Sequence, residues 1–178
     1  MGAMLVVVLG GARSGKSTFA EQMARRADGG VVYIATSPRI AGDSDLDERI
    51  ARHRADRPGD WATIEEETDL AGALTRAGDA FVVVDCLTTW VNNLLHHGRS
   101  GPDVIAAGDA ALDAVAARPN KTVAVSNEAG KGIVPGNELL VWEEAAILGS
   151  VWGGAGKTIF LLVGVACLFS TQLTLVDG

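Results

Sequence analysis

The stretch from residue 10 to residue 17 reads Gly-Gly-Ala-Arg-Ser-Gly-Lys-Ser and decides the fold. It fits the pattern G-x-x-x-x-G-K-[ST] at every fixed position. An apolar, largely β-branched run over 4–9 precedes it, and a stretch of helical character over 17–27 follows it. In that context the glycines let backbone N–H groups close around phosphate oxygens, and the start of the helix adds positive potential. The sequence therefore predicts a nucleotide-binding P-loop, with a chance glycine-rich turn as the minor alternative.

Every residue of this loop is a candidate nucleotide contact. The set is Gly10, Gly11, Ala12, Arg13, Ser14, Gly15, Lys16 and Ser17. Lys16 is expected to neutralise the β- and γ-phosphates during catalysis, and the hydroxyl of Ser17 is expected to bind Mg²⁺. A similar fragment at 153–158 departs from the pattern, because Val151 stands where the first glycine belongs and the apolar run follows it. That fragment is predicted to be an ordinary loop.

Short apolar runs alternate with helical stretches along the chain. The runs are at 31–35, 81–84 and 122–125, and the helical stretches at 46–57, 65–77, 87–95 and 104–117. This alternation predicts an α/β fold, with a mostly parallel sheet flanked by helices in a single P-loop domain over residues 1–178. The apolar run at 159–169 is shorter than the roughly 20 residues that a bilayer span needs, and it is interpreted as a buried strand.

The composition and charge of the chain exclude several classes of protein. Hydrophobic residues make up 48% of the chain and charged residues 21%, which excludes a disordered chain. A net charge of −7 without a Lys/Arg block argues against a nucleic-acid partner. Two cysteines give no disulfide framework, and the start of the chain lacks a basic, apolar secretion signal. We therefore expect a cytoplasmic protein without a membrane span that acts on small molecules.

Candidate functional residues lie at or just after the predicted strand ends, at Gly10, Thr36, Asp85 and Asn127. Ligands of open α/β sheets bind at this edge. Asp85 ends the run Phe-Val-Val-Val-Asp, which is the usual place for a Mg²⁺ ligand or catalytic carboxylate beside a P-loop. A structural cap at the end of the strand is the alternative for Asp85.

His53 stands in the sequence Arg-Ile-Ala-Arg-His-Arg at 49–54. One interpretation is a surface histidine in a solvated basic stretch. The other is a histidine that acts on a polyphosphate while the arginines neutralise its charge. The pattern by itself leaves both open.

Six blocks together resemble one family. They are GGARSGKSTFAE at 10–21, VVYIATS at 31–37, ERIARHRADRP at 48–58, DWATIEEETDLAGAL at 60–74, VVVDCLTTWVNNLL at 82–95 and VAVSNEAGKGIVP at 123–135. In this order and spacing, the chain resembles the bifunctional adenosylcobinamide kinase/adenosylcobinamide-phosphate guanylyltransferase family over about 4–137. Beyond Asn137 it departs from the family's pattern, which has a basic helix there.

The resemblance implies a RecA-like core, a homotrimer and two reactions. ATP or GTP phosphorylates adenosylcobinamide, and GMP then passes from GTP through a guanylylated histidine, matched by His53, to give adenosylcobinamide-GDP. By position, further nucleotide contacts are Ala35, Thr36, Ser37, Arg54, Glu65, Glu66 and Asp85, and the metal is Mg²⁺ on Ser17 and Asp85. A carboxylate can accept both the N1–H and the N2–H₂ of guanine. Two alternatives stay open: a simpler small-molecule kinase in which His53 is a bystander, and a nucleotide-binding module without turnover.

Overall fold

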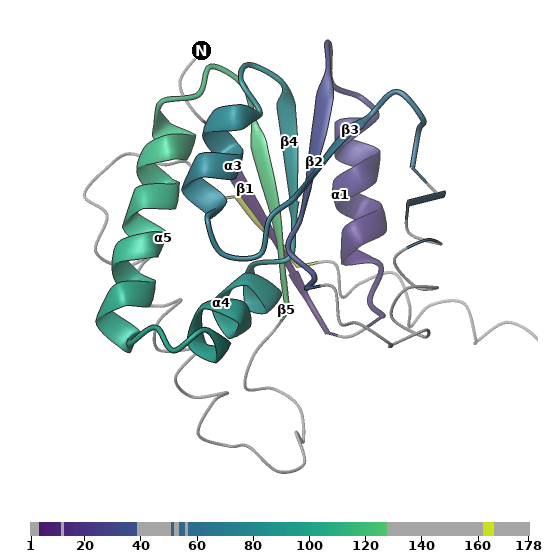
Figure 1. Cartoon of the computed structure of the whole chain (residues 1–178). Coiled ribbons are helices and arrows are strands. Elements are labelled where there is room, and N and C mark those ends of the chain that lie inside the picture. Colours follow the sequence, from purple (N-terminus) through teal and green to yellow (C-terminus); the bar gives the residue numbers. More distant parts are fainter. Residues whose placement is uncertain are drawn as a thin grey trace, which may run out of the picture.

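The computed structural model describes residues 4–11, 13–38, 51, 54, 55, 57–127 and 162–165. Within this part of the chain, six strands pair in parallel in the order β3-β2-β4-β5-β1-β6 (Figure 1). The strands are β1 (Leu5–Gly10), β2 (Val31–Ala35), β3 (Ala62–Glu65), β4 (Phe81–Asp85), β5 (Thr122–Asn127) and β6 (Leu162–Val165). The helices are α1 (Lys16–Ala24), α3 (Leu70–Arg76), α4 (Leu87–His96) and α5 (Gly101–Ala116).

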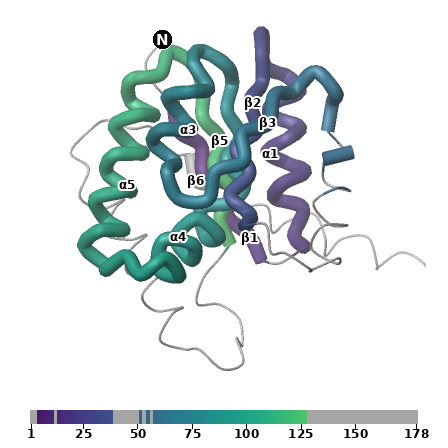
Figure 2. The backbone as a smooth tube through the Cα atoms, viewed as in Figure 1, coloured from purple at the N-terminus to yellow at the C-terminus, as the bar shows by residue number. Residues whose placement is uncertain are grey.

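Helices cover the sheet unequally on its two faces. Helix α1 lies on one face, and α3, α4 and α5 lie on the other (Figures 1 and 2). The alternation of side chains along β4 shows the division, because Phe81 and Val83 pack in the cluster that includes α1, while Val82 and Val84 pack with α3 and α4. Both faces are therefore buried, as the continuous apolar runs predicted.

Local sequence explains where the helices begin. Ser100 and Asp103 form a capping box at the start of α5. The Ser100 hydroxyl oxygen accepts from the backbone N–H of Asp103, and the Asp103 carboxylate accepts from the backbone N–H of Ser100. The Asp69 carboxylate accepts a hydrogen bond from the backbone N–H of Gly72 at the start of α3. These caps satisfy N–H groups that have no partner inside the helix.

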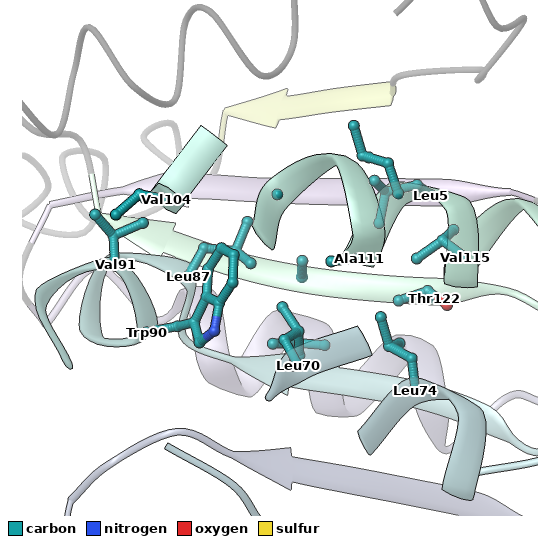
Figure 3. Close-up of a pocket in the computed structure, with 14 residues that line it drawn as sticks. Leu5, Leu70, Leu74, Leu87, Trp90, Val91, Val104, Ala111, Val115 and Thr122 are labelled. Atoms are coloured by element: carbon teal, nitrogen blue, oxygen red, sulfur yellow. The ribbon is translucent and has the colours of Figure 1, made fainter. Parts of the chain in front are cut away.

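An apolar cavity of about 50 Å³ lies between α5 and the sheet (Figure 3). Leu70 and Trp90 line it from the neighbouring helices, and Ala111 and Val115 line it from α5. The hydroxyl of Thr122 is buried at its wall and has no hydrogen-bond partner within the described part of the chain.

The structure confirms the predicted strands at 4–9, 31–35, 81–84 and 122–125 and finds a strand at 162–165 within the last apolar run. The predicted helix over 65–77 was wrong at its start, because 62–65 forms the edge strand β3 and α3 begins only at Leu70. Most of the predicted helix over 46–57 and the fragment at 153–158 lie outside the described residues. Among the described residues, no helix is long and apolar enough to cross a membrane.

Candidate nucleotide-binding site

The strand register brings the predicted site residues to one edge of the sheet. Asp85 at the end of β4 is opposite Ala35 at the end of β2, and Ala35 is opposite Glu65 at the end of β3. At the other side of this edge, Gly10 is opposite Asn127. Since all these strands run in parallel, their carboxyl ends share the edge where α/β folds bind ligands.

The loop after β1 has the backbone of a phosphate cradle. Arg13 and Gly15 have φ values of 59° and 82°, in the left-handed region. Gly10 is needed for a different reason, because a Cβ atom there would collide with the Ser14 side chain. The Ser14 hydroxyl is buried without a hydrogen-bond partner within the described part of the chain, so the closed loop leaves a donor unused. Ala12 lies outside the described residues.

Lys16 is held at the base of this loop. Its side chain is 8% exposed, and its Nζ donates a hydrogen bond to the carbonyl oxygen of Gly11 over 2.9 Å. Ser17 follows in the first turn of α1 and is half-buried. The structure thus keeps an ammonium group and a hydroxyl group beside the cradle, where the sequence predicted them.

Asp85 lies on the α1 side of the sheet, because it continues the alternation of Phe81 and Val83. Burial raises the pKa of the Cys86 thiol, hydrogen bonds from Thr89 lower it, and the charges of Asp85 and Lys16 act on it in opposite directions. The two charges therefore lie close to the same thiol. This proximity supports the prediction that Asp85 and the P-loop belong to one site.

A buried tyrosine holds the Asp85 carboxylate. The hydroxyl of Tyr33 donates a hydrogen bond to Oδ2 of Asp85 over 2.5 Å, and Tyr33 is 2% exposed. Burial first, and then the charge of Asp85, raise the pKa of Tyr33 far above its ordinary value. The phenol therefore keeps its proton and remains a donor. The guanidinium of Arg57 lies 3.4 Å from the centre of the Tyr33 ring.

Thr36 ties the ends of β2 and β4 together. Its backbone N–H donates to the Asp85 carbonyl oxygen over 3.0 Å. Its hydroxyl accepts from the Cys86 N–H and donates to the Cys86 carbonyl oxygen, and Asn93 donates to the Thr36 carbonyl oxygen. The polar atoms of Thr36 are thus engaged within the protein. A nucleotide contact at Ala35, Thr36 or Ser37 stays a prediction.

Glu65 and Glu66, which together with Asp85 are the candidate carboxylates for a guanine contact, differ in their surroundings. Both carboxylate oxygens of Glu66 are engaged, by backbone N–H groups of Thr68 and Asp69 and by Arg76. Burial raises the pKa of Glu66, but these donors outweigh it and hold that pKa below its ordinary range. Glu65 has a 41% exposed side chain, and its Oε1 lies 3.7 Å from Nη1 of Arg54.

His53 lies outside the described residues, so its role stays a prediction. Sequence reasoning missed Tyr33 and Arg57 as site residues. The only signal for Tyr33 was its place two residues before the end of a strand, beside the strand that ends at Asp85. Arg57 carried no signal that distinguished it from the other arginines of its stretch.

Oxygen donors fit a magnesium ion here. Mg²⁺ is held by one or two carboxylates together with substrate phosphates, and it keeps several waters. Ser17 and Asp85 offer one hydroxyl and one carboxylate, both on the α1 side of the sheet edge. Among the described residues, no group of three or more His, Cys, Asp or Glu is arranged so that it could hold a metal ion. The donor set thus suits an ion that arrives with a nucleotide.

Comparison with known proteins agrees with this chemistry. The model of the family described as cobinamide kinase / cobinamide phosphate guanyltransferase matches residues 6–144. The bifunctional adenosylcobalamin biosynthesis protein CobP of Pseudomonas aeruginosa is 43% identical over 136 residues, which are 75% of this chain and 76% of the relative. The CobU protein of Salmonella typhimurium is 39% identical over 150 residues, covering 76% of this chain and 81% of the relative.

A solved structure of an ATPase from a bacterial type III secretion system has a similar fold. It superimposes with a TM-score of 0.52 at 12% identity, over 82% of this chain. The chain spans about half the length of that ATPase, 49%. The likeness shows the fold alone, and it confirms the predicted α/β fold with a mostly parallel sheet flanked by helices.

Proposed function

This chain belongs to the cobinamide kinase / cobinamide phosphate guanyltransferase family, and from that premise we propose how its residues divide the two reactions. The chain is a bifunctional cobinamide kinase and cobinamide-phosphate guanylyltransferase of adenosylcobalamin biosynthesis. The observation that carries the proposal is the P-loop with its buried Lys16 on the same sheet edge as Asp85. Family membership disfavours both the simpler kinase and the module without turnover.

In the kinase reaction, the loop over 10–17 holds the triphosphate of GTP or ATP. Backbone N–H groups bind the phosphate oxygens, and Lys16 neutralises charge as the γ-phosphoryl group transfers to the hydroxyl of adenosylcobinamide. Ser17 and Asp85 would hold Mg²⁺, which supplies further charge neutralisation when bound. The protein's main contribution is positioning, because phosphoryl transfer needs no covalent enzyme intermediate.

In the second reaction, His53 is the nucleophile. A neutral ring nitrogen attacks the α-phosphorus of GTP, the bond to the β-phosphate oxygen breaks, and pyrophosphate leaves while the ring loses its proton. A phosphate oxygen of adenosylcobinamide phosphate then displaces the histidine, and the P–N bond breaks to give adenosylcobinamide-GDP. Arg54 and its neighbouring arginines would stabilise the charge of the departing pyrophosphate.

Base recognition falls to Glu65 in this proposal. A carboxylate accepts two hydrogen bonds, which matches the N1–H and N2–H₂ donors of guanine. The Glu65 side chain is 41% exposed, whereas the two oxygens of Glu66 accept from the start of α3 and from Arg76. The proposal also retains the homotrimer and the cytoplasmic location that the family resemblance and the composition suggest.

Labelling the protein with α-³²P-GTP and Mg²⁺ tests the histidine. We expect an acid-labile label on the wild-type protein and none on His53→Ala, while His53→Ala still phosphorylates adenosylcobinamide at a near wild-type rate. His97→Ala is the matched control, since the His97 side chain is 54% exposed and lies 3.7 Å from Glu67. Loss of both activities in His53→Ala, or a label that survives it, would contradict the proposal.

A further inference from the structure

We propose that Tyr33 is a positioning residue that orients Asp85 for metal binding, and that Arg57 fixes Tyr33 in place. The inference rests on the proposed role of Asp85 as a Mg²⁺ ligand. It is carried by the 2.5 Å hydrogen bond from the Tyr33 hydroxyl to Oδ2 of Asp85 and by the 3.4 Å stacking distance of Arg57 on the Tyr33 ring. We call these three residues the Arg57–Tyr33–Asp85 stack.

The hydrogen bond orients the carboxylate. A carboxylate at the end of a strand can rotate, and each rotation moves the oxygen that faces the ligand. Since the Tyr33 hydroxyl binds Oδ2, the rotation of the carboxylate is restricted, and Oδ1 would be the atom that binds the metal. Partners of this kind behind metal ligands fix the geometry of the ligand, and their loss weakens metal binding or activity by about 10- to 100-fold.

Tyr33 itself is fixed from two sides. It lies in β2, in register with Val83, and is 2% exposed within the cluster on the α1 side of the sheet. The guanidinium of Arg57 covers its ring, and the Arg57 side chain is only 9% exposed. Nε of Arg57 in turn lies 3.9 Å from Oε1 of Glu21 in α1. The attraction between a cation and an aromatic face is stronger at a site shielded from water than at an exposed one, so this contact should hold the Tyr33 ring in place.

The stack also includes a residue close in sequence to the proposed nucleophile of the second reaction. Arg57 follows His53 by four residues in the sequence, and through Tyr33 it is one contact from Asp85. Arg57, which lies close in sequence to the proposed guanylylated histidine, thus packs on the tyrosine that holds the carboxylate proposed for the kinase reaction. A change at Arg57 should therefore alter the metal requirement of the kinase, although Arg57 does not touch Asp85 in any contact described.

Direct metal binding tests the inference without relying on turnover. Mn²⁺ binding in the presence of GDP is measured by electron paramagnetic resonance, and the Mg²⁺ dependence of the kinase rate is measured alongside. We expect Tyr33→Phe, which keeps the ring and removes only the hydroxyl, to weaken Mn²⁺ binding by about 10-fold or more. Binding of GDP without metal should change by less than about 2-fold, because no nucleotide contact is lost.

The Arg57 variants give a second measurement that keeps Tyr33 intact. Arg57→Met removes the charge, and we expect about 3- to 10-fold weaker Mn²⁺ binding, whereas Arg57→Lys keeps a cation over the ring and should restore most of it. If Tyr33→Phe does not fold, Mn²⁺ binding by these two Arg57 variants tests the inference. Equal effects of Arg57→Met and Arg57→Lys would overturn the role of Arg57.

Two controls separate this inference from the proposed function. Thr122→Val removes one buried hydroxyl from the opposite face and the opposite end of the sheet, where Thr122 borders the apolar cavity (Figure 3), and it should leave Mn²⁺ binding unchanged. Asp85→Asn should weaken Mn²⁺ binding at least as much as Tyr33→Phe. If Asp85→Asn weakens it and Tyr33→Phe does not, the inference alone fails. If Asp85→Asn has no effect, Asp85 is no metal ligand, and both its proposed metal role and the inference about Tyr33 fail.

Discussion

Replacing Lys16 by alanine is expected to abolish phosphoryl transfer while the fold remains. Lys16 is 8% exposed and lies 2.9 Å from the Gly11 carbonyl oxygen, so the loop holds its charge in place before a nucleotide arrives. A unit charge about 4 Å from a phosphate oxygen contributes about 4 kcal/mol at an effective dielectric constant of about 20. Loss of most of this in the transition state corresponds to a rate about 10²- to 10³-fold lower.

The free energy of unfolding should fall much less than the transition-state stabilisation does. Lys16→Ala removes one hydrogen bond, which contributes about 1 kcal/mol to the free energy of unfolding. Transfer of ³²P from γ-labelled GTP to adenosylcobinamide measures the rate, and thermal unfolding measures stability. Lys121→Ala is the control, because Lys121 is exposed and precedes β5 at the other end of the sheet. A Lys16→Ala enzyme that keeps more than about a tenth of the wild-type rate would refute the assignment of Lys16.

Two further predictions concern stability. Glu66→Gln should lower the free energy of unfolding by about 1–2 kcal/mol at pH 7, since the carboxylate accepts two backbone N–H groups and Arg76. Because the pKa of Glu66 is lowered in the folded state, this advantage is fully present above the unfolded pKa of about 4.3 and is lost as the pH falls through the lower folded-state pKa. The difference in urea unfolding between the two proteins should therefore be smaller at pH 3.5 than at pH 7. Arg118→Met should cost about 2–4 kcal/mol in urea unfolding, because Arg118 is 6% exposed and donates to the carbonyl oxygens of Leu74 and Ala80, and a cost below about 1 kcal/mol would contradict this.

Most of the sheet could be predicted because its inner strands are continuous apolar runs. Strands β1, β2, β4 and β5 are buried on both faces, so each reads as valine-rich sequence that no surface helix would show. Strand β3 could not be predicted, since it has four residues, lies at the sheet edge and is only half-buried. Its last residue, Glu65, and the two glutamates that follow favoured a helix, and pairing with β2 overrides that preference.

The site was predictable to the extent that it depends on backbone position. The P-loop pattern and the acidic end of β4 are local signals, and the parallel register alone then places them together. The Tyr33–Asp85 hydrogen bond and the Arg57 stacking join residues 52 and 24 positions apart, and no spacing rule covers such contacts. What separates Glu66 from Glu65 is likewise a tertiary contact, because Arg76 reaches only one of two adjacent carboxylates in the contacts described.

Under the proposed function, the order of the strands would allow one nucleotide site to support attack at two different phosphorus atoms. The phosphate cradle follows β1, and Glu65 ends β3, which is four strand spacings away in the order β3-β2-β4-β5-β1, or about 19 Å. A triphosphate held in the cradle with its base at Glu65 must lie along the edge in an extended form, so its α-phosphate passes near the ends of β4 and β2. Those strands carry Asp85 and Tyr33, and Arg57 packs on the Tyr33 ring. The γ-phosphate at the cradle and the α-phosphate at the middle of the edge would thus lie far enough apart to meet different nucleophiles, which in the proposed function are a corrinoid hydroxyl and His53.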